Sequence, residues 1–310
     1  MTKTWQKIKA DPNLKEKYLV REKVIDIIRA FFKNQGFHEV STPILVSIPS
    51  CEPNLEVFQT QLRTASGVKC KAYLILSPEY SLKKLISAGL GNIFEITKCF
   101  RNEEEVSRLH NPEFTMLEWY RVNADYRDIM QDFENLFVKI IGKNKFTYQG
   151  EEYDISLPWP RISFAELGMA EIPDEEFYKK FFNEVEPKLR ASHKPAIIYD
   201  YPISQAALAR PKASDPRFAE RFEVFLAGLE LGNCFSELTN AEEQKRRFTK
   251  ELAERKRLGK TEYLMDKDLI EALNSMPPTA GIAVGVDRLI MLAADAEDIS
   301  ETLFFPASEE

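Results

Sequence analysis

Arginine, glutamate and aromatic residues stand close together around residues 100–120 and offer the clearest chemistry in the sequence. Arg101 and Glu103 follow one β-rich run. Phe114, Glu118 and Tyr120 lie on the next such run, after a charged stretch that suits a loop. Side chains two apart on a strand share a face, so we expect Arg101 and Glu103 to point the same way and the other three to form one wall. Arginine can hold phosphate oxygens, and an aromatic ring can stack on a purine. A solvated hairpin whose charges pair with one another is the alternative.

Three glutamates at intervals of seven residues, Glu223, Glu230 and Glu237, form a second group. This spacing would place them on one face of a helix, and a solvated helix is one interpretation. Gly228 and Gly232 disfavour a helix here. As strands and tight turns, the segment would instead bring several carboxylates into one cleft. Clustered carboxylates suit Mg²⁺, which is normally shared with substrate phosphates, or an ammonium ligand.

A third group lies near the C-terminus, where an apolar, β-branched run ends at Asp287 and Arg288 and a helical pattern follows. An arginine at such a junction is well placed to bind an anion, because the N-terminus of a helix also attracts negative charge. A structural ion pair between an aspartate and an arginine is the alternative.

Composition excludes several other classes of protein. The 310 residues are 44% hydrophobic and 29% charged, as in soluble globular proteins. No apolar stretch has the length of a membrane span, and residues 1–9 lack the apolar core of a signal peptide, so we expect a cytoplasmic protein with no membrane partner. The net charge of −7 argues against broad binding of RNA. The four cysteines form no C-x-x-C pair, which favours reduced thiols over a zinc site.

Periodicity predicts the elements that must position these residues. Mixed helices and strands without a regular βαβ rhythm favour an antiparallel α+β fold. The segment of about 149–216 is rich in proline and acid, and we interpret it as a helical insertion. Helices are predicted at 19–34, 79–88, 127–141 and 241–258, strands at 71–76, 93–100, 114–120, 218–226 and 229–238, and a strand–helix unit at 281–294.

In this order and at these separations, the segments resemble the signature motifs of class II aminoacyl-tRNA synthetases, in detail those of the lysyl branch. The helix before Gly36, together with Pro43, resembles motif 1, the dimer-forming element. Phe100-Arg101-Asn102-Glu103 through Tyr120 resembles motif 2, and Gly285-Val286-Asp287-Arg288 resembles motif 3. The resemblance implies one catalytic domain over residues 1–310, with an antiparallel sheet flanked by helices, acting as a homodimer.

The resemblance also implies ATP and Mg²⁺ as cofactors and a role for each matching residue. Arg101 would contact the α-phosphate and the amino-acid carboxylate, and would stabilise charge in an in-line displacement without a covalent enzyme intermediate. Glu103 would read the adenine amino group. The adenine would lie between Phe114 and Arg288, which would also bind the γ-phosphate. The remaining ATP and metal contacts would be His110 and Asn111 for the triphosphate and Glu223 and Glu230 for Mg²⁺.

The same resemblance implies a pocket for an amino acid with two amines. Glu79 would bind one amine, and Asn233 would lie near the carboxylate. The distal amine would be bound by Glu118, Tyr120 and Glu237. Acids at both ends of the pocket would select lysine over neutral amino acids.

The layout further resembles the family of elongation factor P–lysine ligases, stand-alone paralogues of the lysyl enzyme. Motif 1 begins almost at once, so no OB-fold anticodon-binding domain is expected, and tRNA binding should be weak or absent. The family attaches lysine, preferentially (R)-β-lysine, to a lysine side chain of elongation factor P. Ser77 and Ala283 stand where the tRNA-charging enzymes usually have alanine and glycine. A hydroxyl and a methyl of this kind suit a shifted amine and are worth about 1–3 kcal/mol of discrimination.

Two other functions stay open. A truncated lysyl-tRNA synthetase that still charges tRNA is favoured by Phe235-Ser236-Glu237-Leu238 and by residues 277–281, which resemble the tRNA-charging branch. The Lys- and Arg-rich segment 245–260 could contact RNA, although such segments are usually solvated helix faces. A non-catalytic, amino-acid-binding regulatory paralogue is the alternative from another class. The presence of Arg101, Glu103 and Arg288 favours an enzyme.

Overall fold

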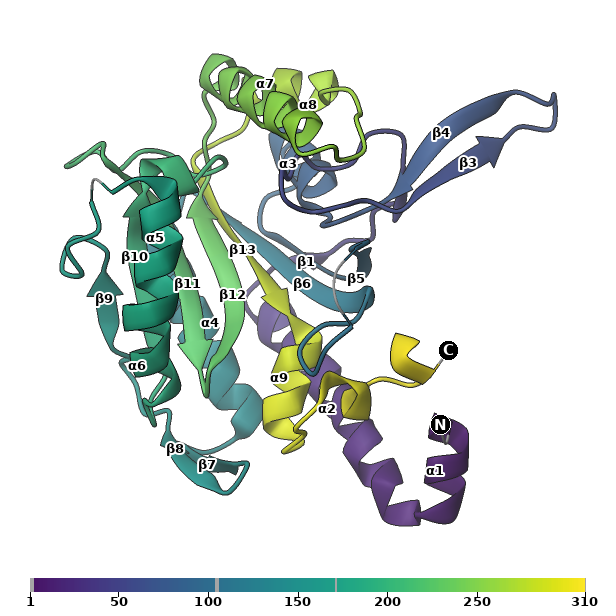
Figure 1. The fold of residues 1–310 in the computed structure, drawn as a ribbon, viewed down its shortest axis with the longest axis vertical. Helices are drawn as coiled ribbons and strands as arrows, with labels where there is room; N and C mark the ends of the chain where they lie inside the picture. The colour runs from purple at the N-terminus through teal and green to yellow at the C-terminus, as the bar shows by residue number, and fades with distance from the viewer. Residues whose placement is uncertain (1–2, 104–105, 171, 310) are drawn as a thin grey trace.

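An eight-stranded mixed sheet runs through the centre of the molecule (Figure 1). The computed structural model describes residues 3–103, 106–170 and 172–309. The two outermost pairs of strands, β1 with β5 and β9 with β10, are parallel, and the strands between them are antiparallel. The α+β fold expected from the sequence is therefore confirmed. In spatial order the strands are β1 (His38–Glu39), β5 (Ile93–Phe100), β6 (Glu113–Val122), β13 (Thr279–Gly285), β12 (Leu229–Ser236), β11 (Phe218–Leu226), β10 (Ala196–Pro202) and β9 (Arg161–Ser163).

One face of the sheet is closed by helices and holds the main hydrophobic core. The helices are α2 (Pro12–Asn34), α4 (Tyr126–Ile141) and α9 (Val286–Ala293). Phe32 of α2 lies 4.9 Å from Trp119 of β6, centroid to centroid, and Ile282 of β13 joins the same cluster. Because alternate residues of a strand face opposite sides, Glu118 and Ala283 face away from this core. The opposite face of the sheet is thus left for polar chemistry.

Two groups of helices border that opposite face. The first packs around the start of β5 and the end of β6, and the second covers β10 and β11. Figure 1 shows the two groups on either side of the central strands. They consist of α3 (Glu79–Ser87), α7 (Ala241–Arg257) and α8 (Lys267–Leu273) on one side, and α5 (Asp174–Lys180), η1 (Phe181–Val185) and α6 (Glu186–Arg190) on the other.

The remaining elements lie around this frame. A three-stranded sheet, whose β3–β4 hairpin projects from the body in Figure 1, precedes α3, and a two-stranded hairpin follows α4. Thr4 donates its backbone N–H and its hydroxyl to Glu309 at 2.7 and 2.6 Å. These elements are α1 (Thr4–Ala10), β2 (Leu45–Val46), β3 (Gln59–Arg63), β4 (Lys69–Leu74), β7 (Lys145–Tyr148), β8 (Glu151–Asp154), η2 (Ile203–Gln205), η3 (Ile299–Thr302) and η4 (Ala307–Glu309). Within the described ranges, no helix combines the length and the apolar character that crossing a bilayer requires.

The helical insertion expected at about 149–216 is wrong in part. Asp174–Lys180 and Glu186–Arg190 are helical, but the same segment supplies β9 and β10, which extend the central sheet. Nearly every residue of Ala196–Pro202 is buried. A strand covered on both faces shows no alternation of polar and apolar residues, so the sequence pattern did not reveal β10.

A buried aspartate, Asp287, joins α2, β6 and α9 through one ion pair and one hydrogen bond. Asp287, the second residue of α9, is 2% exposed and accepts a hydrogen bond from the backbone N–H of Thr115 at 2.7 Å. Its other carboxylate oxygen pairs with Arg21 of α2. Asp287 therefore serves the structural role that was the alternative for this motif, but its partner is Arg21 rather than Arg288.

Replacing Arg21 with methionine should lower the free energy of unfolding by about 3 kcal/mol, because the Asp287 carboxylate would stay buried without its cation. Urea unfolding monitored by circular dichroism measures the effect. Arg29→Met on the same helix is the control: Arg29 pairs with Glu39 at the surface, and its loss should cost less than about 1 kcal/mol. Equal effects of the two substitutions would contradict the role given to Asp287.

Candidate active site

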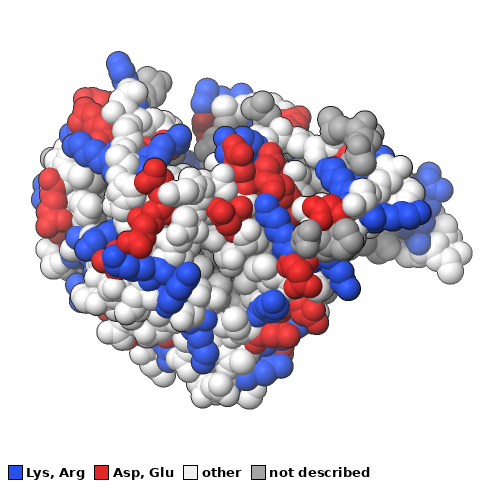
Figure 2. Space-filling model, turned by 90° about the horizontal axis from the view of Figure 1, so that it is seen from below, with Lys and Arg blue, Asp and Glu red and all other residues white. Residues whose placement is uncertain are grey.

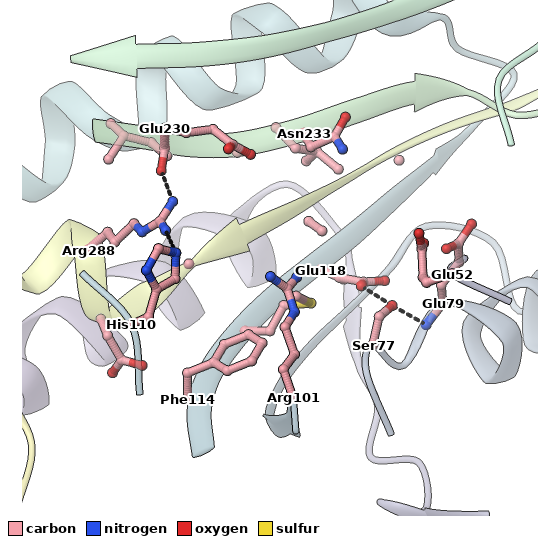
Figure 3. A pocket seen from close by; sticks show the side chains of 18 of the residues that line it. Glu52, Ser77, Glu79, Arg101, His110, Phe114, Glu118, Glu230, Asn233 and Arg288 are labelled. Atoms are coloured by element: carbon pink, nitrogen blue, oxygen red, sulfur yellow. Dashed lines mark hydrogen bonds between the residues drawn. The ribbon is translucent and has the colours of Figure 1, made fainter. Parts of the chain in front are cut away.

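A cavity of about 250 Å³ opens on the polar face of the sheet. Its walls come from β6, β12 and β13, from the loop before β6, and from the start of α3 (Figure 3). Every residue that the sequence predicted for the site lines this cavity, except Glu103 and Glu223. The three sequence segments are therefore brought together in space.

The register of the strands explains why these side chains meet. Glu118 of β6 is paired with Ala283 of β13, which is paired with Asn233 of β12. Residues directly opposite each other on neighbouring strands point to the same face of a sheet. The next row contains Tyr120 and Gly281, and a Cβ on Gly281 would lie 2.3 Å from the Tyr120 ring. Glycine is needed here because the tyrosine ring occupies the space of the missing side chain.

Buried carboxylates form one end of the cavity. The Ser77 hydroxyl donates to Glu118 Oε1 at 2.5 Å, and the Tyr120 hydroxyl donates to Oε2 at 3.1 Å. Ser77 Oγ also accepts from the backbone N–H of Glu79 at 3.0 Å, which ties Glu118 to the start of α3 (Figure 3). Burial, reinforced by the charge of Glu79, raises the pKa of Glu118 to about 8. A cationic ligand would relieve both effects.

Lys83, which sequence reasoning missed, lies among these acids. Its Nζ contacts Glu79 Oε1 and lies 2.6 Å from Glu237 Oε2. Glu79 and Glu237 are therefore neighbours, and they are not separated at two ends of the pocket as expected. Lys83 follows Glu79 by four residues on a predicted helix, and this spacing could have revealed it. Burial raises the pKa of Glu237 to about 8.

Glu52 is a further carboxylate that the sequence analysis did not single out. It lines the cavity beside Glu79 (Figure 3), and burial together with the charge of Glu79 raises its pKa to about 7. Glu52 lies outside the regular elements, between β2 and β3. No helical or strand period marks such a position, so the sequence offers no signal for it.

Cationic and aromatic groups form the other end. The Arg101 guanidinium carbon lies 5.0 Å from the centroid of the Phe114 ring. Arg288, the third residue of α9, donates to the Glu230 backbone oxygen at 2.7 Å and to His110 Nε2 at 3.0 Å (Figure 3). Because arginine can only donate, His110 Nε2 is the acceptor. In the neutral ring, His110 Nδ1 then carries the proton and donates to the Ser107 hydroxyl at 3.1 Å.

Asn111 is tied into the protein rather than directed wholly at the cavity. Its amide nitrogen donates to the Glu113 carbonyl oxygen at 2.6 Å, and its amide oxygen accepts from the backbone N–H of Ala307 at 2.9 Å. Asn233 accepts from Arg221 Nε at 3.1 Å. Both residues therefore position neighbouring segments in addition to lining the site.

The expectation that Arg101 and Glu103 share a strand face is wrong. β5 ends at Phe100, and Glu103 has a positive φ of 58°. The Glu103 side chain is 64% exposed and accepts from Lys260 Nζ at 3.0 Å. The alternation of a strand cannot be extended past its last paired residue. The next two residues of this loop, at 104–105, lie outside the described part of the chain.

Glu223 lines a second cavity of about 380 Å³, which shares Glu230 with the first. Glu223 pairs with Arg221 at 2.5 Å and accepts from the Tyr201 hydroxyl. Burial and the charge of Glu223 raise the pKa of Glu230 to about 7. Two neighbouring carboxylates whose like charges repel each other suit a divalent cation. Among the residues that the structure describes, no group of three or more His, Cys, Asp or Glu side chains could hold a metal ion.

The two ends of the cavity therefore differ in what they can bind. Arg101, Arg288 and Phe114 offer guanidinium groups and an aromatic face, which suit an anion attached to a planar base. Glu79, Glu118 and Glu237 offer buried carboxylates, which suit one or more ammonium groups.

Comparison with known proteins agrees with this geometry. A family model described as tRNA synthetases class II (D, K and N) matches residues 1–309. An elongation factor P–(R)-β-lysine ligase of Mannheimia succiniciproducens is 40% identical, over 92% of this chain and 93% of that protein. One of Vibrio atlanticus is 37% identical over 99% of both chains. A lysine–tRNA ligase of Pelotomaculum thermopropionicum is 36% identical over 96% of this chain, which spans 64% of that protein's length. The chain therefore belongs to the class II tRNA synthetase family, in the group of the D, K and N enzymes.

Proposed function

We propose that this protein activates lysine or (R)-β-lysine with ATP as an aminoacyl-adenylate, and transfers the aminoacyl group to a lysine side chain of elongation factor P. The cluster of buried carboxylates carries the proposal for the amino acid. Glu118 and Glu237 have raised pKa values because they are buried near other acids, so an amino acid with two ammonium groups is the complementary ligand. The relatives named as elongation factor P–(R)-β-lysine ligases support the acceptor.

The chemistry would proceed in two displacements. An oxygen of the amino-acid carboxylate attacks the α-phosphorus of ATP, the bond to the bridging oxygen breaks, and pyrophosphate leaves. The amine of the acceptor lysine then attacks the adenylate carbonyl carbon, an amide forms, and AMP leaves as the amine loses a proton. Arg101 would stabilise charge in the first step, Phe114 and Arg288 would hold the adenine, and His110 and Asn111 would place the phosphates.

Mg²⁺ fits the pair of carboxylates at Glu223 and Glu230. Both side chains would hold the ion next to Arg288, and the ion would supply charge neutralisation for the phosphates of ATP. The raised pKa of Glu230, caused by burial and by the charge of Glu223, supports this assignment. Glu103 would have to leave Lys260 in order to read the adenine amino group, so we propose that role for the ATP-bound state.

Two residues, Ala283 and Ser77, are proposed to select the isomer of lysine. Ala283 lies between Glu118 and Asn233 in the sheet, and Ser77 donates to Glu118. A methyl and a hydroxyl at these two positions would adjust the site of the amine that differs between α-lysine and (R)-β-lysine. Asn233 would lie near the substrate carboxylate, Glu79 would bind one amine, and Tyr120 and Glu237 would complete the contacts of the other.

We also propose a homodimer, because the family resemblance at α2 and at the strand before Pro43 includes the dimer-forming motif and symmetric dimers are the commonest oligomers. The whole chain would act as one catalytic domain, in the cytoplasm, where translation takes place. Binding of tRNA would be weak. On the face shown in Figure 2, lysines and arginines are interspersed with acids instead of forming one basic patch, and the net charge is −7.

Purified elongation factor P incubated with this protein, ATP and either lysine or (R)-β-lysine should gain the mass of one aminoacyl group, as measured by mass spectrometry. Arg101→Ala is the control, because loss of the guanidinium should abolish adenylate formation without unfolding the protein. Efficient charging of tRNA with α-lysine, together with unmodified elongation factor P, would instead support a truncated lysyl-tRNA synthetase. Absence of ATP–pyrophosphate exchange with both isomers would indicate a non-catalytic paralogue.

The KM for lysine should fall as the pH rises from 6 to 8 and then level off. Glu118 and Glu237 have pKa values of about 8 in the empty pocket, and an ammonium ligand must displace their protons. For each proton released, the KM should change by about tenfold per pH unit below the pKa. Pyrophosphate-exchange kinetics at each pH measure the KM for lysine, and Glu118→Gln should flatten its dependence on pH. A KM that is constant over this range would contradict the proposed role of these acids.

Ala283→Gly should shift the preference from (R)-β-lysine toward α-lysine by about fivefold in kcat/KM, since one methyl is worth roughly 1 kcal/mol. Exchange kinetics with both isomers give the ratio. Ala280→Gly is the matched control on the same strand, because Ala280 belongs to the main hydrophobic core on the opposite face. It should lower stability without changing the ratio. An unchanged ratio in the Ala283 variant would remove this residue from isomer selection.

A further inference from the structure

Lys83 is a buried ammonium inside the end of the cavity that we assign to substrate amines. Its side chain is 2% exposed, and it lies on the first turns of α3. Its Nζ contacts Glu79 on the same helix and, at 2.6 Å, Glu237 just after β12. Lys83 therefore bridges the helix and the sheet through two carboxylates that both line the cavity.

The contacts of Lys83 continue into the row of residues at the base of the cavity. Glu79 donates its backbone N–H to Ser77, and Ser77 donates its hydroxyl to Glu118. A change in the position of Glu79 would therefore be transmitted to Glu118. The groups around this network that carry or can carry charge are Glu52, Glu118 and Tyr120, with Arg101 farther along the cavity and Glu251 of α7 outside the cavity lining.

The charges at this end of the cavity match one particular kind of ligand. Glu52, Glu79, Glu118 and Glu237 carry four negative charges when all are ionised, and Lys83 supplies one positive charge. A diammonium amino acid would balance two of the three that remain, and Glu52, whose pKa is raised by burial, can keep a proton. Without Lys83, the space between Glu79 and Glu237 would be the strongest site for an ammonium, and the substrate itself could occupy it.

We propose that Lys83 is a positioning residue, whose ammonium group fills the space between Glu79 and Glu237 and thereby keeps the substrate amines out of that space. This inference rests on the proposed activation of a diamino acid. With Lys83 in place, the substrate amines meet the other carboxylate oxygens, and the substrate carboxylate reaches the α-phosphate. Without it, an amine of the substrate enters the vacated space, and the carboxylate is drawn away from the nucleotide.

The signature of this role is a loss of kcat without a rise in KM. Lys83→Ala should lower kcat for lysine-dependent pyrophosphate exchange by at least about tenfold, because misplaced substrate binds without reacting. The KM for lysine should stay the same or fall. Lys84→Ala is the matched control on the same helix: Lys84 pairs with Asp266 at 2.6 Å, away from the cavity, and kcat should be unchanged.

Chemical rescue gives the sharper test. The n-propylammonium ion reproduces the part of the lysine side chain that Lys83→Ala removes, and its addition should restore kcat in a saturable way. It should have no such effect on the Lys84→Ala variant, and tetramethylammonium, which cannot donate a hydrogen bond, should not rescue. If Lys83→Ala is unfolded alone, Lys83→Met keeps the space between Glu79 and Glu237 filled without the charge. Substrate amines then stay out of that space, so kcat should stay within about threefold of the wild type, and a loss of about tenfold would overturn the inference.

Three outcomes for Lys83→Ala would overturn the inference. They are a kcat within twofold of the wild type, a raised KM with an unchanged kcat, or recovery of the fold on adding propylammonium without recovery of kcat. These differ from failure of the proposed function. If the proposed function fails, the wild-type protein itself forms no adenylate with lysine or (R)-β-lysine. If only the inference about Lys83 fails, the wild type is active.

Discussion

Carboxylates buried in excess of the cations beside them are the constraint on which this site depends. A buried charge is costly unless it is paired or neutralised, and this protein meets the cost in three ways. Lys83 pairs Glu79 and Glu237, hydroxyl groups of Ser77 and Tyr120 hold Glu118, and raised pKa values allow Glu118 and Glu52 to keep a proton. Each of these arrangements is reversible, so the pocket is organised for a ligand that carries positive charge.

The central sheet fixes the positions of the side chains that line the cavity. Three adjacent antiparallel strands, β6, β13 and β12, present one face to the hydrophobic core and the other to the cavity. Side chains on the cavity face are held by pairing between strands and not by loops, so their spacing is as rigid as the sheet. The residues on loops behave differently. Glu103 lies just past the end of β5 and pairs with Lys260 at the surface, although the family resemblance assigns it to the nucleotide.

Much of this could be predicted from the sequence, because long elements with clear periods dominate the region of the site. The strands on either side of the motif 2 loop and the strand–helix unit around Arg288 were predicted in the right places, and the helix predicted at 19–34 ends where expected but begins earlier, at Pro12. β10 was missed because it is buried on both faces, and Glu103 was misplaced because alternation was extended beyond its strand. Glu52 became visible only when distant segments were brought together, whereas Lys83 could have been found from its spacing of four residues from Glu79 on a predicted helix.

The pairing of Gly281 with Tyr120 limits how such a pocket can vary. The tyrosine ring occupies the volume that any side chain at position 281 would need, so the two positions on neighbouring strands behave as a single unit. A larger residue on β13 is compatible with a functional pocket only if the aromatic ring on β6 is exchanged for something smaller at the same time. A side chain added at position 281 alone would collide with the ring, and the hydroxyl that holds Glu118 is lost in every exchange that replaces the tyrosine by a residue without a hydroxyl there. The hydrogen bond that holds Glu118 in place therefore depends on the absence of one carbon atom on the adjacent strand.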